Sequence, residues 1–115
     1  MDNDQYELGV NNGFSDEKAM SGFLMSQRPH SYTIGYMAGY AMNVMSMQGG
    51  SAIVAANVLG ELSWQYNIDI EEIDDHILDE IFENEGGFTD ELRSAFDKGF
   101  DEKCEELDDD YDDED

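Results

Sequence analysis

The fold of this 115-residue chain is decided by residues 29–60, PHSYTIGYMAGYAMNVMSMQGGSAIVAANVLG, which contain no Asp, Glu, Lys or Arg. Gly49 and Gly50 divide the stretch, and polar residues such as Asn43 and Asn57 interrupt its two parts. Neither part therefore offers the roughly 18 consecutive apolar residues that a membrane span requires. The stretch predicts a pair of buried helices rather than a membrane protein.

Helix-capping residues and the helical spacing of apolar residues predict further helices on both sides of this pair. The predicted helices cover residues 16–28 after the cap Ser15, 32–48, 52–66 after the cap Ser51 and before a left-handed Asn67, 70–85 after the cap Asp69, and 90–107 after the cap Thr89. No segment alternates convincingly as a strand would. The sequence predicts an all-α protein, with a single-domain bundle of four to five helices over residues 1–107.

Two glycines give the second predicted helix one flat side. Gly35 and Gly39 lie four residues apart, and methionines surround them in the sequence at Met20, Met25, Met37, Met42 and Met45. Packing in the core of one chain is the first explanation for these residues. A homodimer seam is the alternative, because small residues let two helices approach closely.

The charge is large, negative and unevenly distributed. The chain carries 29 acidic and five basic side chains, a net charge of −24, of which residues 1–60 contribute −3 and residues 61–115 contribute −21. So few cations exclude direct binding of nucleic acid or of an anionic membrane and favour a basic partner. A protein that is acidic only as an adaptation to high salt would spread its charge over the whole surface, so the segregation disfavours that explanation.

The carboxylates of the last two predicted helices fall on stripes opposite the apolar faces. The stripes, with two neighbouring acids, make a candidate partner-binding surface of Asp69, Glu72, Asp75, Asp79, Glu80, Glu83, Asp90, Asp97, Asp101 and Glu105. Like charges one turn apart oppose helix formation. A merely solvated face is the simple explanation for one stripe, whereas two successive stripes and an acidic tail favour a binding surface.

The density of these charges is comparable to that of DNA. Residues 69–85 carry nine carboxylates over 17 residues, or roughly 25 Å of helix. That is one charge per about 3 Å, close to the value of about 3.4 Å for one DNA strand, and the whole chain matches the charge of about 12 base pairs. The tail at 108–115, DDDYDDED, repels itself and is predicted to be disordered.

No residues suggest catalysis, a metal site or a cofactor. Cys104 is the only cysteine and has no activating motif around it, and His76 is read as a surface imidazole because the chain has no Glu-x-x-His pair. The chain is therefore predicted not to be an enzyme. The lone cysteine and the absence of a secretory signal after Met1 predict a cytoplasmic protein.

In size, helical pattern, charge and terminal acidic tail, the chain resembles the phage-encoded DNA-mimic proteins. The resemblance implies an inhibitor that occupies the DNA-binding groove of a host DNA-binding protein or nuclease complex, of the anti-restriction or anti-CRISPR type. It covers residues 69–105 and the tail, and it rests on no shared motif. The alternative is an acidic chaperone or assembly factor for a basic protein, which would use the tail more than the folded stripes.

Overall fold

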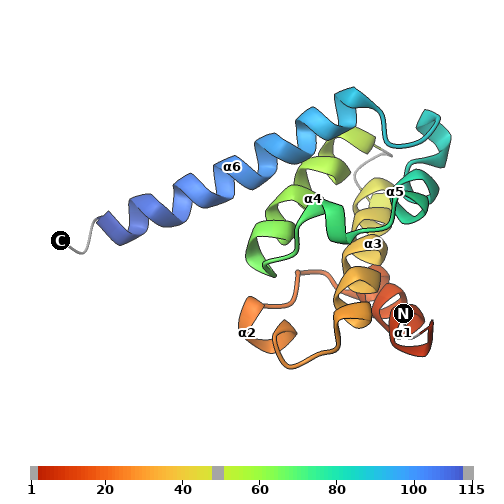
Figure 1. Cartoon of the computed structure of the whole chain (residues 1–115), viewed down its shortest axis with the longest axis horizontal. Helices are drawn as coiled ribbons and strands as arrows, with labels where there is room; N and C mark the ends of the chain where they lie inside the picture. Colours follow the sequence, from red (N-terminus) through yellow and green to blue (C-terminus); the bar gives the residue numbers. More distant parts are fainter. Residues whose placement is uncertain (1–2, 48–50, 113–115) are drawn as a thin grey trace.

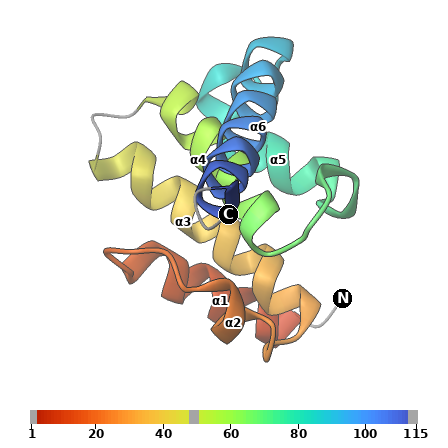
Figure 2. The ribbon, with the colours of Figure 1, turned by 90° about the vertical axis from the view of Figure 1, so that its left-hand side faces the viewer.

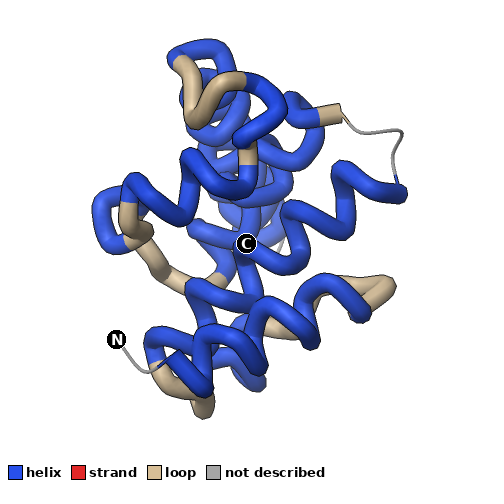
Figure 3. Tube along the Cα trace, turned by 90° about the vertical axis from the view of Figure 1, so that its right-hand side faces the viewer, coloured by secondary structure: helices blue, strands red, loops and turns tan. Residues whose placement is uncertain are grey.

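The computed structural model describes the backbone of residues 3–47 and 51–112 and the side chains of residues 3–46 and 51–105. This part of the chain consists of helices and the loops that join them, and it contains no strand (Figure 3). The helices are α1 (Asn3–Ser15), α2 (Gly22–Met25), α3 (His30–Met47), α4 (Ala52–Gln65), α5 (Asp75–Ile81) and α6 (Asp90–Asp112), with short 3-10 helices η1 (Ile70–Glu72) and η2 (Glu83–Glu85). The predicted all-α class is confirmed.

Helix α3 is the centre of the fold. Helix α1 packs along one side of it, α4 and α5 contact it from the other side, and α6 packs on α4 (Figures 1 and 2). Residues 31–39 of α3 are all buried, which only a segment without charges permits at low cost. The predicted buried helical pair is thus α3 and α4, while Gly49 and Gly50 between them lie outside the described residues.

Helices α1 and α3 touch backbone to backbone at four glycines. A Cβ atom on Gly35 or Gly39 of α3 would overlap carbonyl oxygens of α1, and a Cβ atom on Gly9 or Gly13 of α1 would overlap carbonyl oxygens of α3. The flat side of α3 is therefore occupied by α1 of the same chain. Packing within one chain, the first explanation for Gly35 and Gly39, is therefore confirmed, and the alternative of a homodimer seam through them is wrong because their surface is buried within the monomer.

Helices α4 and α6 approach each other in the same way. A Cβ atom on Gly60 would overlap the carbonyl oxygen of Phe96, and one on Gly99 would overlap that of Asn57. The Asn57 side chain also donates from Nδ2 to the carbonyl oxygen of Ala95, at 3.3 Å. These contacts fix α6 against the buried helical pair.

Three predicted helix signals are confirmed at the atomic level. The hydroxyl of Ser51 accepts a hydrogen bond from the backbone N–H of Val54 at 3.3 Å, and that of Thr89 accepts one from Leu92 at 3.3 Å. Asn67 follows α4 with a left-handed φ of 56°. The ends of α4 and the start of α6 therefore lie where the sequence places them.

The predicted helix after Ser15 is wrong. Ser15 is the last residue of α1, and its hydroxyl donates to the carbonyl oxygen of Asn11 at 2.9 Å instead of capping a new helix. Asp16 does not start a helix, and its carboxylate accepts a hydrogen bond from the Tyr36 hydroxyl at 2.6 Å. Within 16–28 only α2 is helical, and it is capped by Ser21.

Helix α6 runs past the predicted start of the tail. Its backbone is helical to Asp112, beyond the boundary predicted at Asp108. Once a helix has formed, each further residue that it orders adds one backbone hydrogen bond. The C-terminal end of α6 therefore lies beyond the residues whose apolar side chains pack against the core. The predicted tail otherwise lies outside the described residues, which exclude 113–115 and the side chains of 106–112.

Buried tyrosines fasten the loop between α1 and α2 to the centre of the fold. The hydroxyl of Tyr36, whose side chain is fully buried, donates to Asp16 and accepts from the backbone N–H of Met20 at 2.9 Å. The carbonyl oxygen of Met20 accepts hydrogen bonds from the hydroxyl of Tyr66, at 2.5 Å, and from Gln65 Nε2, at 2.9 Å. The loop is therefore held by side chains from both α3 and α4.

We expect the fold to lose stability in alkaline solution. Burial raises the pKa of the Tyr36 and Tyr66 hydroxyls above the usual value of about 10, and the neighbouring Asp16 carboxylate raises both further. The unfolded chain would release these protons from about pH 10, so the stabilisation is complete below that pH and is lost as the pH rises through the pKa values of the folded state. Tyrosinate absorbance and circular dichroism, followed together against pH, should change in one step. Full ionisation of all six tyrosines near pH 10 with an unchanged helical signal would contradict this expectation.

Candidate acidic interaction surface

The densest charge lies between the end of α4 and the start of α6. Every carboxylate of this segment is exposed, and the segment contains no Lys or Arg. We call these nine residues the acidic cap: Asp69, Glu71, Glu72, Asp74, Asp75, Asp79, Glu80, Glu83 and Glu85. The apolar residues between them, among them Ile73, Ile77 and Phe82, are buried against the core, which leaves the carboxylates in water.

The acidic cap is not the single helix that the sequence predicts. Ile73 has an extended backbone (φ −91°, ψ 121°), and Asp74 then caps α5 by accepting a hydrogen bond from the backbone N–H of His76 at 2.9 Å. Asp75 and Asp79 share a face of α5, whereas Glu72 lies in η1 and Glu83 in η2. The predicted four-residue stripe is therefore wrong, and the charges occupy a compact region rather than a straight rod of about 25 Å.

Several residues of the acidic cap form hydrogen bonds that stabilise the backbone near them. Glu72 forms a capping box with Asp69, accepting from its backbone N–H at 2.8 Å, and its other oxygen lies 4.0 Å from His30 Nε2. Asp79 accepts from the backbone N–H of Phe88 at 3.0 Å. These carboxylates shape the acidic cap and its junction with α6, in addition to carrying charge.

The second stripe lies on one continuous helix. Asp90, Asp97, Asp101 and Glu105 are all exposed on α6, and we call them the α6 stripe. Asp97 accepts from Nε of Arg93, one turn earlier, at 3.2 Å. Between residues 90 and 105 the helix carries six acidic and three basic side chains. The α6 stripe is therefore ordered as predicted but less densely charged than the acidic cap.

The acidic cap and the α6 stripe meet at a small cavity. Asp69 of the cap and Asp97 of the stripe both line this cavity of about 160 Å³, together with the rings of Phe96 and Phe100. Glu80, the remaining predicted site residue, is exposed on α5 near Tyr6, and its charge adds to burial in raising the pKa of that tyrosine. All ten predicted residues are exposed, but they lie on two differently built regions.

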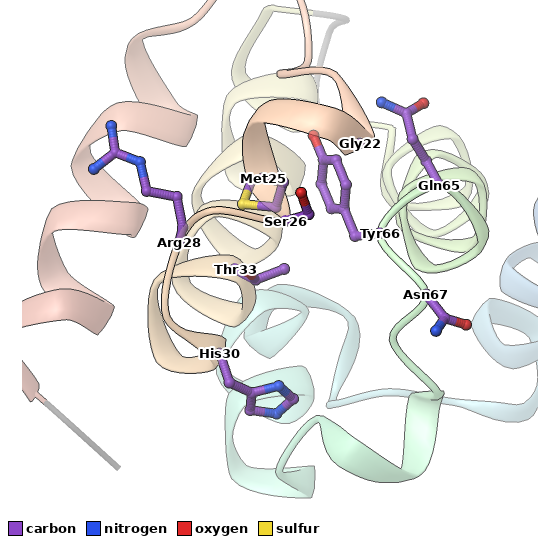
Figure 4. Close-up of a pocket in the computed structure, with 9 residues that line it drawn as sticks. All are labelled: Gly22, Met25, Ser26, Arg28, His30, Thr33, Gln65, Tyr66 and Asn67. Carbon is purple, nitrogen blue, oxygen red and sulfur yellow. The ribbon is translucent and has the colours of Figure 1, made fainter.

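A larger polar cavity of about 410 Å³ lies on the less charged half of the molecule. Figure 4 shows Met25, Ser26 and Tyr66 around it, with Arg28 pointing away. The Arg28 guanidinium stacks instead over Tyr32, 4.7 Å from the ring centre. The Ser26 and Tyr66 hydroxyls already donate to backbone carbonyl oxygens at 2.6 Å and 2.5 Å.

The described part of the chain shows neither a metal site nor a membrane-spanning helix. No group of three or more His, Cys, Asp and Glu side chains is placed to hold a metal ion among these residues. None of the helices described is both long and apolar enough to cross a bilayer. Cys104 is free and half-buried on α6.

A family model whose description reads "Protein of unknown function (DUF2623)" matches residues 1–102. The chain belongs to the DUF2623 family. The match includes the whole acidic cap and the α6 stripe except Glu105, and leaves residues 103–115 outside. No curated protein and no solved structure matches the chain. The DUF2623 description gives no function, so the resemblance to DNA mimics stays a prediction.

Proposed function

We propose that this protein binds the nucleic-acid-binding surface of a basic protein and keeps nucleic acid away from it, as a DNA-mimic inhibitor. The observation that supports the proposal is the acidic cap, where nine carboxylates are exposed in a segment without a Lys or Arg. A partner that binds it would gain the release of counterions that also drives DNA binding. Because the cap is compact, the likeness to DNA lies in charge density more than in the shape of a rod.

The same proposal includes the partner and the compartment. A host DNA-binding protein or a defence nuclease complex, of the restriction or CRISPR type, supplies the required cationic groove, and the cytoplasm is the compartment where such partners are found. The family match supports the folded surface as the binding element, because it ends at residue 102 and so contains the acidic cap but not the terminal tail.

A competition experiment tests this function. A labelled DNA duplex bound to a histone-like DNA-binding protein should be released as the acidic protein is added. Direct binding of the acidic protein to that DNA-binding protein should weaken steeply between low and moderate salt. The acidic protein alone should not retard the duplex in a gel. Retardation of free duplex, or direct binding that does not weaken as salt is raised, would contradict the proposal.

The alternative function is an acidic chaperone for a basic protein. It is favoured by the course of α6, whose C-terminal part extends away from the body of the molecule (Figure 1). A chaperone of this kind would hold its client mainly through the acidic end of that helix. Removal of residues 108–115 should then abolish client binding, whereas an inhibitor that uses the acidic cap should keep most of its activity.

A further inference from the structure

An apolar groove lies between the first turns of α4 and α6, on the acidic half of the molecule. It has a volume of about 460 Å³ and is lined by Ile53, Val54, Asn57, Glu91, Ser94, Ala95 and Lys98. The two aliphatic side chains of α4 are each 41% exposed. Both lie outside the helical spacing kept by Ala55, Val58, Leu59 and Leu62, so the sequence alone indicates only ordinary surface residues.

The groove follows from the way the two helices are fastened. Asn57 bonds to Ala95, and Gly60 brings the backbones together one turn later, so the helices are closely packed from there onwards. Before that point the side chains of Ile53 and Val54 line the hollow and stay exposed. Exposed aliphatic residues that line a hollow are typical of a contact surface, because burying them from water is favourable.

We propose that this groove binds the apolar face of a cationic amphipathic helix belonging to the basic partner. The proposal rests on the proposed function and adds to it the shape of the contact. A helix laid between two others presents apolar residues at intervals of three and four, which fits a groove walled by α4 and α6. An edge strand is disfavoured, because the described residues contain no strand that it could extend.

The groove is bordered by more carboxylates than cations, which favours a positively charged partner. Glu91 lines it, Asp90 lies beside Glu91, and Glu102 follows Lys98 by one turn on the same side of α6. All three carboxylates are exposed, whereas Lys98 is the one cation among the lining residues. Basic residues on the flanks of the incoming helix would pair with these carboxylates while its apolar face covers Ile53 and Val54.

A second copy of the chain is a poorer occupant. The whole sequence holds five Lys and Arg, and three of them lie on α6 among six acidic residues between positions 90 and 105. No helix of the described chain is both cationic and amphipathic. A second molecule would therefore bring further negative charge to a region that already repels it.

The test uses two synthetic peptides of identical composition. One is an 18-residue helix with leucines on one face and lysines on the other, and its control has the same residues scrambled so that no apolar face forms. The full-length protein should bind the amphipathic peptide more tightly than the scrambled one at about half-molar salt, where screening weakens simple charge attraction. Binding should shift the methyl resonances of Ile53, Val54 and Ala95.

A matched pair of variants locates the contact. Ile53→Gln with Val54→Gln should weaken binding of the amphipathic peptide by about tenfold, since two half-exposed aliphatic side chains no longer leave water on binding. Phe23→Gln with Leu24→Gln changes two residues of α2 that are 74% and 54% exposed, and it should leave the affinity unchanged. Both variants should keep the helical signal of the parent.

The outcomes separate this inference from the function on which it rests. Equal binding of both peptides, lost in high salt and unaffected by the groove variant, would leave the acidic function standing and overturn the groove. Binding of neither peptide, even at low salt, would contradict both. Self-association that the groove variant abolishes would show that a second copy occupies the groove, and would also overturn the inference.

Discussion

Replacing Gly60 by Ala should lower the free energy of unfolding by about 3 kcal/mol. The added Cβ would overlap the carbonyl oxygen of Phe96, and the neighbouring obstacle is backbone, which cannot rotate away as a side chain can. Helices α4 and α6 would have to separate and leave gaps along their whole contact. Chemical denaturation followed by circular dichroism measures the change.

The sign of this effect is diagnostic, since Gly→Ala inside a helix normally stabilises a protein by about 0.5–1 kcal/mol. Gly86 supplies a control of another kind: a Cβ there meets nothing within 4 Å, but its φ of 85° disfavours any side chain. Gly86→Ala should therefore cost only about 1 kcal/mol. An unchanged or raised stability for Gly60→Ala would show that α4 and α6 are not in backbone contact.

Neutralising three carboxylates of the acidic cap should weaken inhibition by about tenfold to a hundredfold, if each charge contributes roughly 0.5–1 kcal/mol to binding. The suitable substitutions are Glu71→Gln, Asp75→Asn and Glu83→Gln, because these side chains are exposed and take part in none of the described hydrogen bonds. The variant should be as stable as the parent or more so, because like-charge repulsion is reduced. Competition with labelled duplex measures the loss.

The matched control removes the same charge from the tail. Asp108, Asp109 and Asp110, all changed to Asn, alter the net charge equally and leave the acidic cap intact. The inhibitor proposal expects the smaller loss from this control. Equal losses would mean that only total charge matters, and a larger loss from the tail variant would favour the chaperone.

The centre of the fold could be predicted because its signals are local. The uncharged stretch, the cap Ser51 and the left-handed Asn67 identify α3 and α4 without knowledge of their neighbours. Helix α1 has no such signal. It contacts α3 at Gly9 and Gly13, where the lack of a side chain lets the two backbones approach. A pattern of apolar side chains gives no signal at such positions.

The acidic cap shows a different limit of sequence reasoning. The apolar residues from Ile70 to Phe82 keep helical spacing although the chain leaves the helix at Ile73, so the pattern is the same for one helix or for two short ones. What decides between them is Asp74, which leaves the helical conformation itself (φ −58°, ψ 135°) and caps α5. Exposure of the ten candidate residues followed from their spacing, but their mutual arrangement did not.

The backbone contacts at the glycines have a consequence for how sequences of this family can vary. A position such as Gly39 or Gly99 accepts no other residue without moving a helix, so we expect it to be unchanged wherever this arrangement of helices is kept. A surface that acts through its electrostatic field constrains each position less, because a carboxylate lost at one exposed site can be compensated by another nearby. Relatives should therefore agree at the glycines and differ at individual acids while their net charge stays strongly negative.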